Sequence, residues 1–113
     1  MAKYLISFPS KAMHIPDGEL AAISRDSHAV VQQAKDAGVY VFAGGIDDSV
    51  APVLVAGDGA VSEGGYPWAR PLDGGLMVVE VASREEAILW AGRIASACRC
   101  EQELRVFYFD AMS

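Results

Sequence analysis

Residues 63–95 read EGGYPWARPLDGGLMVVEVASREEAILWAGRIA and decide the fold, because a glycine-rich approach leads into an apolar strand and then directly into a capped helix. Leu76 to Val81 is almost continuously apolar, which is typical of a central strand covered on both faces. Ser83 followed by Glu86 is a capping-box pattern and marks the start of the helix. The stretch has no nucleophile elbow, phosphate loop or metal-ligand spacing, so it indicates an architecture without indicating a reaction.

The first part of the chain predicts a strand, a helix and a second strand. Ala2 to Phe8 alternates with period two, and Val39 to Ala43 is rich in β-branched and aromatic residues. A helix is expected from near Asp17 to Gly38, where glycine can take the left-handed conformation that ends a helix. The apolar stripe of this helix consists of Leu20, Ile23, Ser27, Val30, Val31 and Ala34.

The remaining segments predict a hairpin, a second helix and a last strand. APVLVA-GDG-AVSE, residues 51–63, predicts a small hairpin, because Asp58-Gly59 offers the backbone freedom of a tight turn. Helical spacing after Ser83 and alternation from Glu103 to Phe109 predict a second helix and a last strand. The whole chain, residues 1–113, is therefore expected to be one α+β domain, a ferredoxin-like split βαβ with an inserted hairpin.

Two helices can cover only one face of such a sheet, yet apolar residues occur on both faces. They include Leu5, Tyr40 or Val41, Met77 or Val78, Phe107 and Phe109. Exposing several of these side chains costs several kcal/mol at about 25 cal/mol per Å² of apolar area. We therefore expect a homodimer that packs sheet against sheet; the alternative is a large apolar ligand on that face.

Composition excludes several classes of partner. Nine basic and fifteen acidic residues give a net charge of −6, which disfavours nucleic acid. No apolar run is long enough to cross a membrane and no leader pattern is present, so a cytoplasmic protein is expected. Cys98 and Cys100 are too close in sequence for an ordinary disulfide, and too few other ligands accompany them for a metal or redox site. We expect no metal and no cofactor.

Four segments together resemble the YCII-related family, including its DGPF-like subgroup: KYLISF, KDAGVYVFAGGI, EGGYPWARPLDGGLMVVEV and SREEAILWAGRI. The resemblance spans nearly the whole chain. It implies a dimeric α/β barrel of the ferredoxin-like type that binds or converts a small molecule, without implying a substrate. Where the subgroup has Asp-Gly-Pro-Phe, this chain has Glu63-Gly64-Gly65-Tyr66, and Pro71 replaces an acidic residue further on.

The resemblance also implies a candidate catalytic residue. Other members carry a histidine on the first helix, paired with an acidic residue, and His28 has a comparable place. His28 lies at the border of the apolar stripe, where it could transfer protons or be an ordinary surface residue. Asp36 lies about 12 Å further along the helix axis, too far to orient His28 directly, so Asp47 or Asp48 is as good a partner.

Tyr66, Trp68 and Arg70 alternate, so in an extended segment they would point the same way and could hold a planar anion. The alternative, which we favour, is that the two aromatic side chains pack in a dimer interface and Arg70 pairs with a carboxylate. Together with His28 and Tyr40 they suggest a cleft between the sheet and the first helix that binds a small organic acid. The function would be proton transfer by His28 without a cofactor, a non-catalytic binding or accessory role, or, by fold analogy alone, a cofactor-free monooxygenase.

Overall fold

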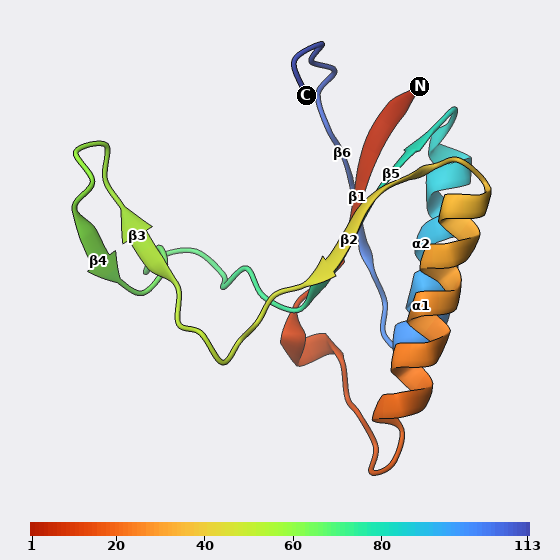
Figure 1. Ribbon diagram of the computed structural model, residues 1–113, viewed down its shortest axis with the longest axis horizontal. Coiled ribbons are helices and arrows are strands. Elements are labelled where there is room, and N and C mark those ends of the chain that lie inside the picture. The colour runs from red at the N-terminus through yellow and green to blue at the C-terminus, as the bar shows by residue number, and fades with distance from the viewer.

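A computed structural model describes residues 1–113, with two helices packed on one face of an antiparallel sheet (Figure 1). The elements are β1 (Ala2–Phe8), η1 (Ser10–Ala12), α1 (Leu20–Asp36), β2 (Tyr40–Gly45), β3 (Val53–Val55), β4 (Val61–Glu63), β5 (Gly75–Val81), α2 (Arg84–Cys98) and β6 (Glu103–Val106). The main sheet has the order β2-β5-β1-β6, while β3 and β4 form a separate pair. The predicted α+β class is confirmed, and the order is compatible with a ferredoxin-like fold.

The core forms where the two central strands meet the helices. Strands β1 and β5 are antiparallel, with Tyr4 opposite Val79 and Ile6 opposite Met77. Because side chains alternate across a strand, these four share one face, and all four are buried. The buried residues of the main cluster are Tyr4, Ile6, Val30, Ala34, Met77, Val79, Val81, Ala87, Trp90, Ile94, Ala97 and Cys98.

Helix α1 begins later than the sequence predicts. Gly18 has φ of 81°, and the amide of Glu19 donates to the carbonyl of Pro16, so residues 16–19 form a turn instead of the first helical turn. The predicted end is confirmed, because Gly38 has φ of 74°. The helix therefore starts at Leu20, three residues after the expected start near Asp17.

Helix α2 starts where the sequence predicts and is tied to α1 at its other end. Ser83 is the N-cap, and its hydroxyl accepts a hydrogen bond from the amide of Glu86 at 3.2 Å. Arg99, at the C-cap, takes the left-handed conformation and forms ion pairs with Asp26 at 2.9 Å and Glu19 at 3.8 Å. The two helices are thus held side by side at this end.

Strand β6 ends at Val106, not at Phe109 as the alternation predicts. The amide of Phe107 still donates to the carbonyl of Lys3, but the neighbouring strand β1 begins at Ala2. In this register Tyr108 would face Ala2 and Phe109 would face Met1, which is outside β1, but the chain leaves β1 after Phe107, and Tyr108 and Phe109 are almost fully exposed. The expected strand is therefore right in position and too long by three residues.

Residues 46–74, which we call the arm, extend away from the two-layered body (Figure 1). The arm contains the predicted hairpin, in which Val53 pairs with Glu63 and Val55 with Val61. The radius of gyration is 15.7 Å, whereas a compact chain of this length has about 13 Å. The hairpin is confirmed, and it is not packed into the body.

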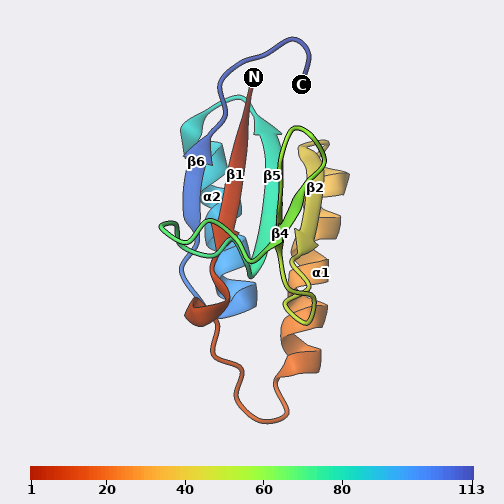
Figure 2. The same cartoon turned by 90° about the vertical axis from the view of Figure 1, so that its left-hand side faces the viewer.

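The other face of the main sheet, which no helix covers, we call the open face; it is turned to the viewer in Figure 2. By alternation it carries Leu5 and Val78 at its centre, and Phe42 opposite Val78 on β2. Lys3 and Glu80, 4.0 Å apart, lie at one end of it. The expected apolar side chains on this face are therefore present, with charged groups beside them.

Candidate functional site

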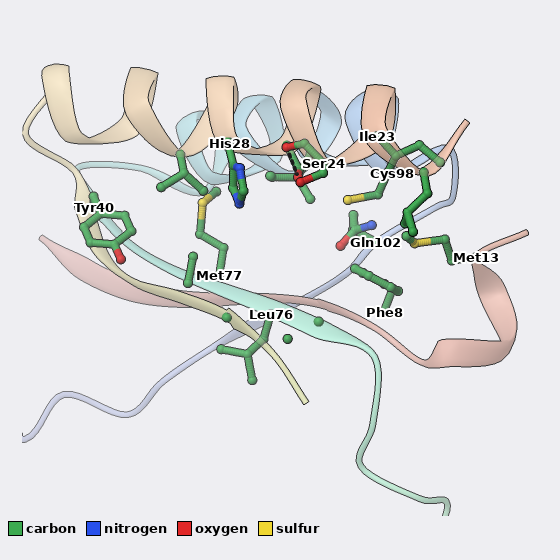
Figure 3. Close-up of a pocket in the computed structure, with 18 residues that line it drawn as sticks. Phe8, Met13, Ile23, Ser24, His28, Tyr40, Leu76, Met77, Cys98 and Gln102 are labelled. Atoms are coloured by element: carbon green, nitrogen blue, oxygen red, sulfur yellow. Dashed lines mark hydrogen bonds between the residues drawn. The ribbon is translucent and has the colours of Figure 1, made fainter. Parts of the chain in front are cut away.

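A cavity of about 340 Å³ lies between α1 and the sheet, where the sequence suggests a cleft (Figure 3). Eleven of the 18 residues that line it are hydrophobic. The lining residues are Phe8, Met13, Leu20, Ile23, Ser24, Ser27, His28, Val31, Tyr40, Ala43, Gly44, Gly45, Gly75, Leu76, Met77, Ile94, Cys98 and Gln102. The cavity is largely apolar, with a few polar groups from both layers.

The apolar stripe of α1 provides one wall. Val30 and Ala34 of the stripe are buried in the core, whereas Leu20, Ser27 and Val31 line the cavity. The stripe is therefore wider than the part of it that the core covers. This surplus leaves apolar surface of α1 facing an open space.

Glycines form part of the opposite wall. Gly44 and Gly45 end β2, and Gly75 begins β5 beside them, with Gly45 paired to Gly75. By alternation Gly45 and Gly75 face α1, whereas Gly44 faces the open side with Phe42, whose ring a Cβ on Gly44 would meet at 3.2 Å. A Cβ atom on Gly75 would lie 2.9 Å from the ring of Phe8, which is too close for ordinary contact. Gly75 thus leaves room for the ring of Phe8, which lines the cavity.

The predicted catalytic residue, His28, projects from α1 at the cavity (Figure 3). It is exposed and forms no ion pair. Of the suggested acidic partners, Asp36 accepts a hydrogen bond from Gln32 at 2.9 Å, and Asp47 accepts one from the hydroxyl of Ser49 at 2.6 Å. His28 therefore lies at the cavity without a carboxylate to orient it.

Tyr40 is the second predicted residue at the cavity, and it lies on β2 with the ammonium group of Lys35 5.0 Å from its ring centroid. Tyr66, Trp68 and Arg70 are not among the residues that line the cavity, so a single chain does not bring the five predicted residues together. They belong to the arm, where the rings of Tyr66 and Trp68 lie 5.0 Å apart. Alternation within one segment predicts that Tyr66, Trp68 and Arg70 point the same way, but it does not predict the direction of the arm.

Two lining residues were missed as site residues. Cys98 lies on the inner face of α2, and burial raises the pKa of its thiol above the ordinary 9.0. Its helical spacing predicts a buried position, but not that a cavity adjoins it. Gln102 lies in the turn between α2 and β6 and has a side-chain oxygen that is buried without a hydrogen-bond partner. No sequence pattern marks a single glutamine in a turn.

The residues that line the cavity include no lysine or arginine, and His28 is the single histidine among them. No three His, Cys, Asp or Glu side chains gather as metal ligands would. Neither helix combines the length and the hydropathy that crossing a bilayer requires. The arrangement suits a small and mainly apolar molecule with a limited number of polar groups.

Comparison with known proteins adds no family. No family model matches the chain, and no curated protein matches it in sequence.

Proposed function

We propose that this chain is a homodimeric small-molecule-binding protein, with its ligand between α1 and the sheet. The cavity of about 340 Å³ carries the proposal. Ligand sites are usually concave, about 300–1,000 Å³ in volume, and mainly apolar with a few polar groups that orient the ligand. The combination of an apolar lining with His28 and Tyr40 fits this description.

The ligand class that we propose is a small organic acid. Its apolar part would lie against α1 and the sheet, and its carboxylate would accept hydrogen bonds from the imidazole of His28 and the hydroxyl of Tyr40. Both donors are at the cavity. The anion-binding role predicted for Arg70 has no support within one chain, since Arg70 lies on the arm.

Binding is favoured over catalysis. A general base of this type is normally held in one orientation by a second group, and His28 has no hydrogen-bond partner of that kind. We therefore propose a binding or accessory role first, and proton transfer by His28 as the second function. The second function requires that ligand binding brings an acidic group to His28.

The homodimer is supported by the accessible surface of the chain. A folded monomer of 12.0 kDa exposes about 6,000 Å², whereas this chain exposes 8120 Å². The excess of roughly 2,000 Å² is within the range of about 1,000–2,500 Å² that each subunit buries in an obligate homodimer. A second copy on the open face would cover Val78 and Phe42 and offer surface to the arm. Closure into an α/β barrel and membership of the YCII-related family belong to this proposal.

Ligand binding is tested by thermal shift with small carboxylates, for which benzoate and hexanoate are the probes. We expect both to raise the melting temperature of the native protein, since a ligand that binds the folded state stabilises it. His28→Ala should weaken binding by about tenfold, the usual effect of losing one charged hydrogen bond. Gln33→Ala, an exposed position on the same helix, is the matched control and should bind as the native protein does.

Two results would contradict the binding site. One is the absence of any shift with either carboxylate at millimolar concentration. The other is equal binding by the native and His28→Ala proteins, which would show that His28 does not contact the ligand. Benzamide, the neutral counterpart of benzoate, should bind more weakly than benzoate, because it lacks the carboxylate that would accept the hydrogen bond from His28.

The dimer is tested by the concentration dependence of the melting temperature, because folding coupled to association stabilises the protein as its concentration rises. Val78→Asp would put a carboxylate at the centre of the open face and should abolish this dependence. Leu89→Asp makes the same type of change on the exposed face of α2 and should preserve it. If Val78→Asp retained the native dependence, a second copy would not lie on the open face.

A further inference from the structure

Gln102 contributes a buried polar group to the cavity. Its amide nitrogen donates to the carbonyl of Cys100 at 3.2 Å and lies 3.5 Å from the sulfur of the same residue. Its side-chain oxygen is buried and accepts no hydrogen bond. Figure 3 shows the amide between α1 and the sheet, below Cys98 and beside Phe8.

The orientation of this amide follows from its neighbours. The carbonyl of Cys100 can only accept hydrogen bonds, so the amide nitrogen must be the atom that faces it. The reverse orientation would bring two oxygens together. The oxygen of Gln102 therefore points away from Cys100, and it is this oxygen that lacks a partner.

A buried acceptor without a donor is unfavourable, because it has lost its hydrogen bonds to water and gained none. Among the labelled neighbours in Figure 3, Phe8, Ile23 and Met13 are apolar, and the Cys98 thiol is only a weak donor. The protein therefore leaves one acceptor unpaired beside a cavity that is otherwise mainly apolar. A donor from a bound molecule would complete it.

We propose that the side-chain oxygen of Gln102 is a specificity-determining acceptor, which selects ligands that present an N–H or O–H group on an apolar body. The inference rests on the proposed function, since it describes the ligand of the same cavity. A carboxylate is disfavoured next to Gln102, because both groups would be acceptors. The acidic group of the ligand thus belongs near His28, and a hydroxyl or amine group near Gln102.

The test compares indole with benzofuran, which has the same bicyclic shape but an ether oxygen in place of the N–H group. Dissociation constants are measured by NMR titration of backbone amides around the cavity. We expect the native protein to bind indole about fivefold to tenfold more tightly than benzofuran, as one hydrogen bond to a buried acceptor predicts. Gln102→Leu should remove this preference, and Gln33→Leu, at an exposed position, should keep it.

Each other outcome overturns the inference. Equal binding of the two probes by the native protein would mean that Gln102 selects no donor, for instance because a water molecule already satisfies its oxygen; the cavity would remain a binding site. Binding of neither probe would contradict both the acceptor and the cavity. A preference for indole that survives in Gln102→Leu would place the selecting group elsewhere. If Gln102→Leu does not fold, Gln102→Met replaces it in the test. The comparison of indole with benzofuran on the native protein tests the inference without either variant.

Discussion

The fold requires glycine at position 74, because a Cβ atom has no room there. Its φ is 79°, and a Cβ atom there would collide with the carbonyl oxygen of Phe8 and lie 2.9 Å from the carbonyl carbon of Pro9. The close approach joins the end of β1 to the start of β5, beside the cavity. A larger residue would have to move backbone atoms, because no flexible side chain is available to yield.

We therefore expect Gly74→Ala to lower the free energy of unfolding by at least about 2 kcal/mol, from the left-handed backbone and the collision together. Urea denaturation measures the change. Gly57→Ala is the matched control, since Gly57 has no positive φ and no atom within 4 Å of the added Cβ. Equal stability of the two variants would contradict this account of Gly74.

Asp73 acts at the same junction by hydrogen bonding. Its two carboxylate oxygens accept from the amide of Ser10 at 2.8 Å and from the hydroxyl of Ser10 at 2.9 Å. These bonds favour the charged carboxylate, and they hold its pKa below the ordinary 3.8. A carboxyl group with a lowered pKa in the folded state stabilises that state above pH 3.8, and this contribution is lost as the pH falls through the lowered value.

Asp73→Ala should therefore lower the melting temperature at pH 7, and the gap to the native protein should narrow once the pH falls below 3.8. Thermal melts over a pH series measure the gap. Adding Ser10→Ala to Asp73→Ala should cost little more than the single change, because Asp73→Ala already removes the bond that the hydroxyl of Ser10 donates. A gap that stays constant at every pH would show that the carboxylate charge contributes nothing.

At the scale of elements, the cap of α2 is the clearest local signal that the structure confirms. The hydroxyl of Ser83 satisfies the amide of Glu86, one of the free donors at the helix start. Ser83→Ala should lower the free energy of unfolding by about 1 kcal/mol. Ser96→Ala, in the same helix and exposed, should be neutral or slightly stabilising, since alanine favours helix more than serine does. Denaturant titration measures the free energy of unfolding of both variants. Equal values would show that the Ser83 cap does not stabilise the helix.

Elements whose signal is local could be predicted from the sequence. Period-two alternation locates β1, the cap locates α2, and Gly38 locates the end of α1. The ends of some elements could not. Strand β6 ends at Val106, opposite Tyr4, although the alternation continues to Phe109, and the start of α1 is delayed by the turn at Gly18. Trp90 is buried, and the guanidinium group of Arg93 lies 4.4 Å from the centroid of its ring. Helical spacing alone does not predict this packing.

The same distinction holds for the site. Helical spacing brings His28 to the border of the buried face, and the structure places it at the cavity. Tyr66, Trp68 and Arg70 lie elsewhere, because the direction of the arm depends on contacts far away in sequence. Gln102 is a candidate because its side-chain oxygen is buried without a hydrogen-bond partner. The sequence does not predict this, because it depends on the folded environment of the residue.

At the scale of the whole molecule, the chain exposes more apolar surface than an isolated fold of this size needs. Only 13 of 113 residues are buried, so most apolar residues are at least partly exposed. Many exposed ones lie on the arm and the open face, including Val53, Val55, Val61, Trp68, Phe42 and Phe107. A second cavity of about 310 Å³, lined by Lys3, Val41, Val78 and the C-terminal residues, adds to this face. An identical copy would bury both regions together.

The central claim is that the open face is covered by a second copy of the chain. Sedimentation equilibrium at micromolar concentration measures the mass in solution without reference to shape. The account predicts about 24 kDa, twice the 12.0 kDa of one chain. A mass of 12.0 kDa that persists as the concentration is raised would contradict it.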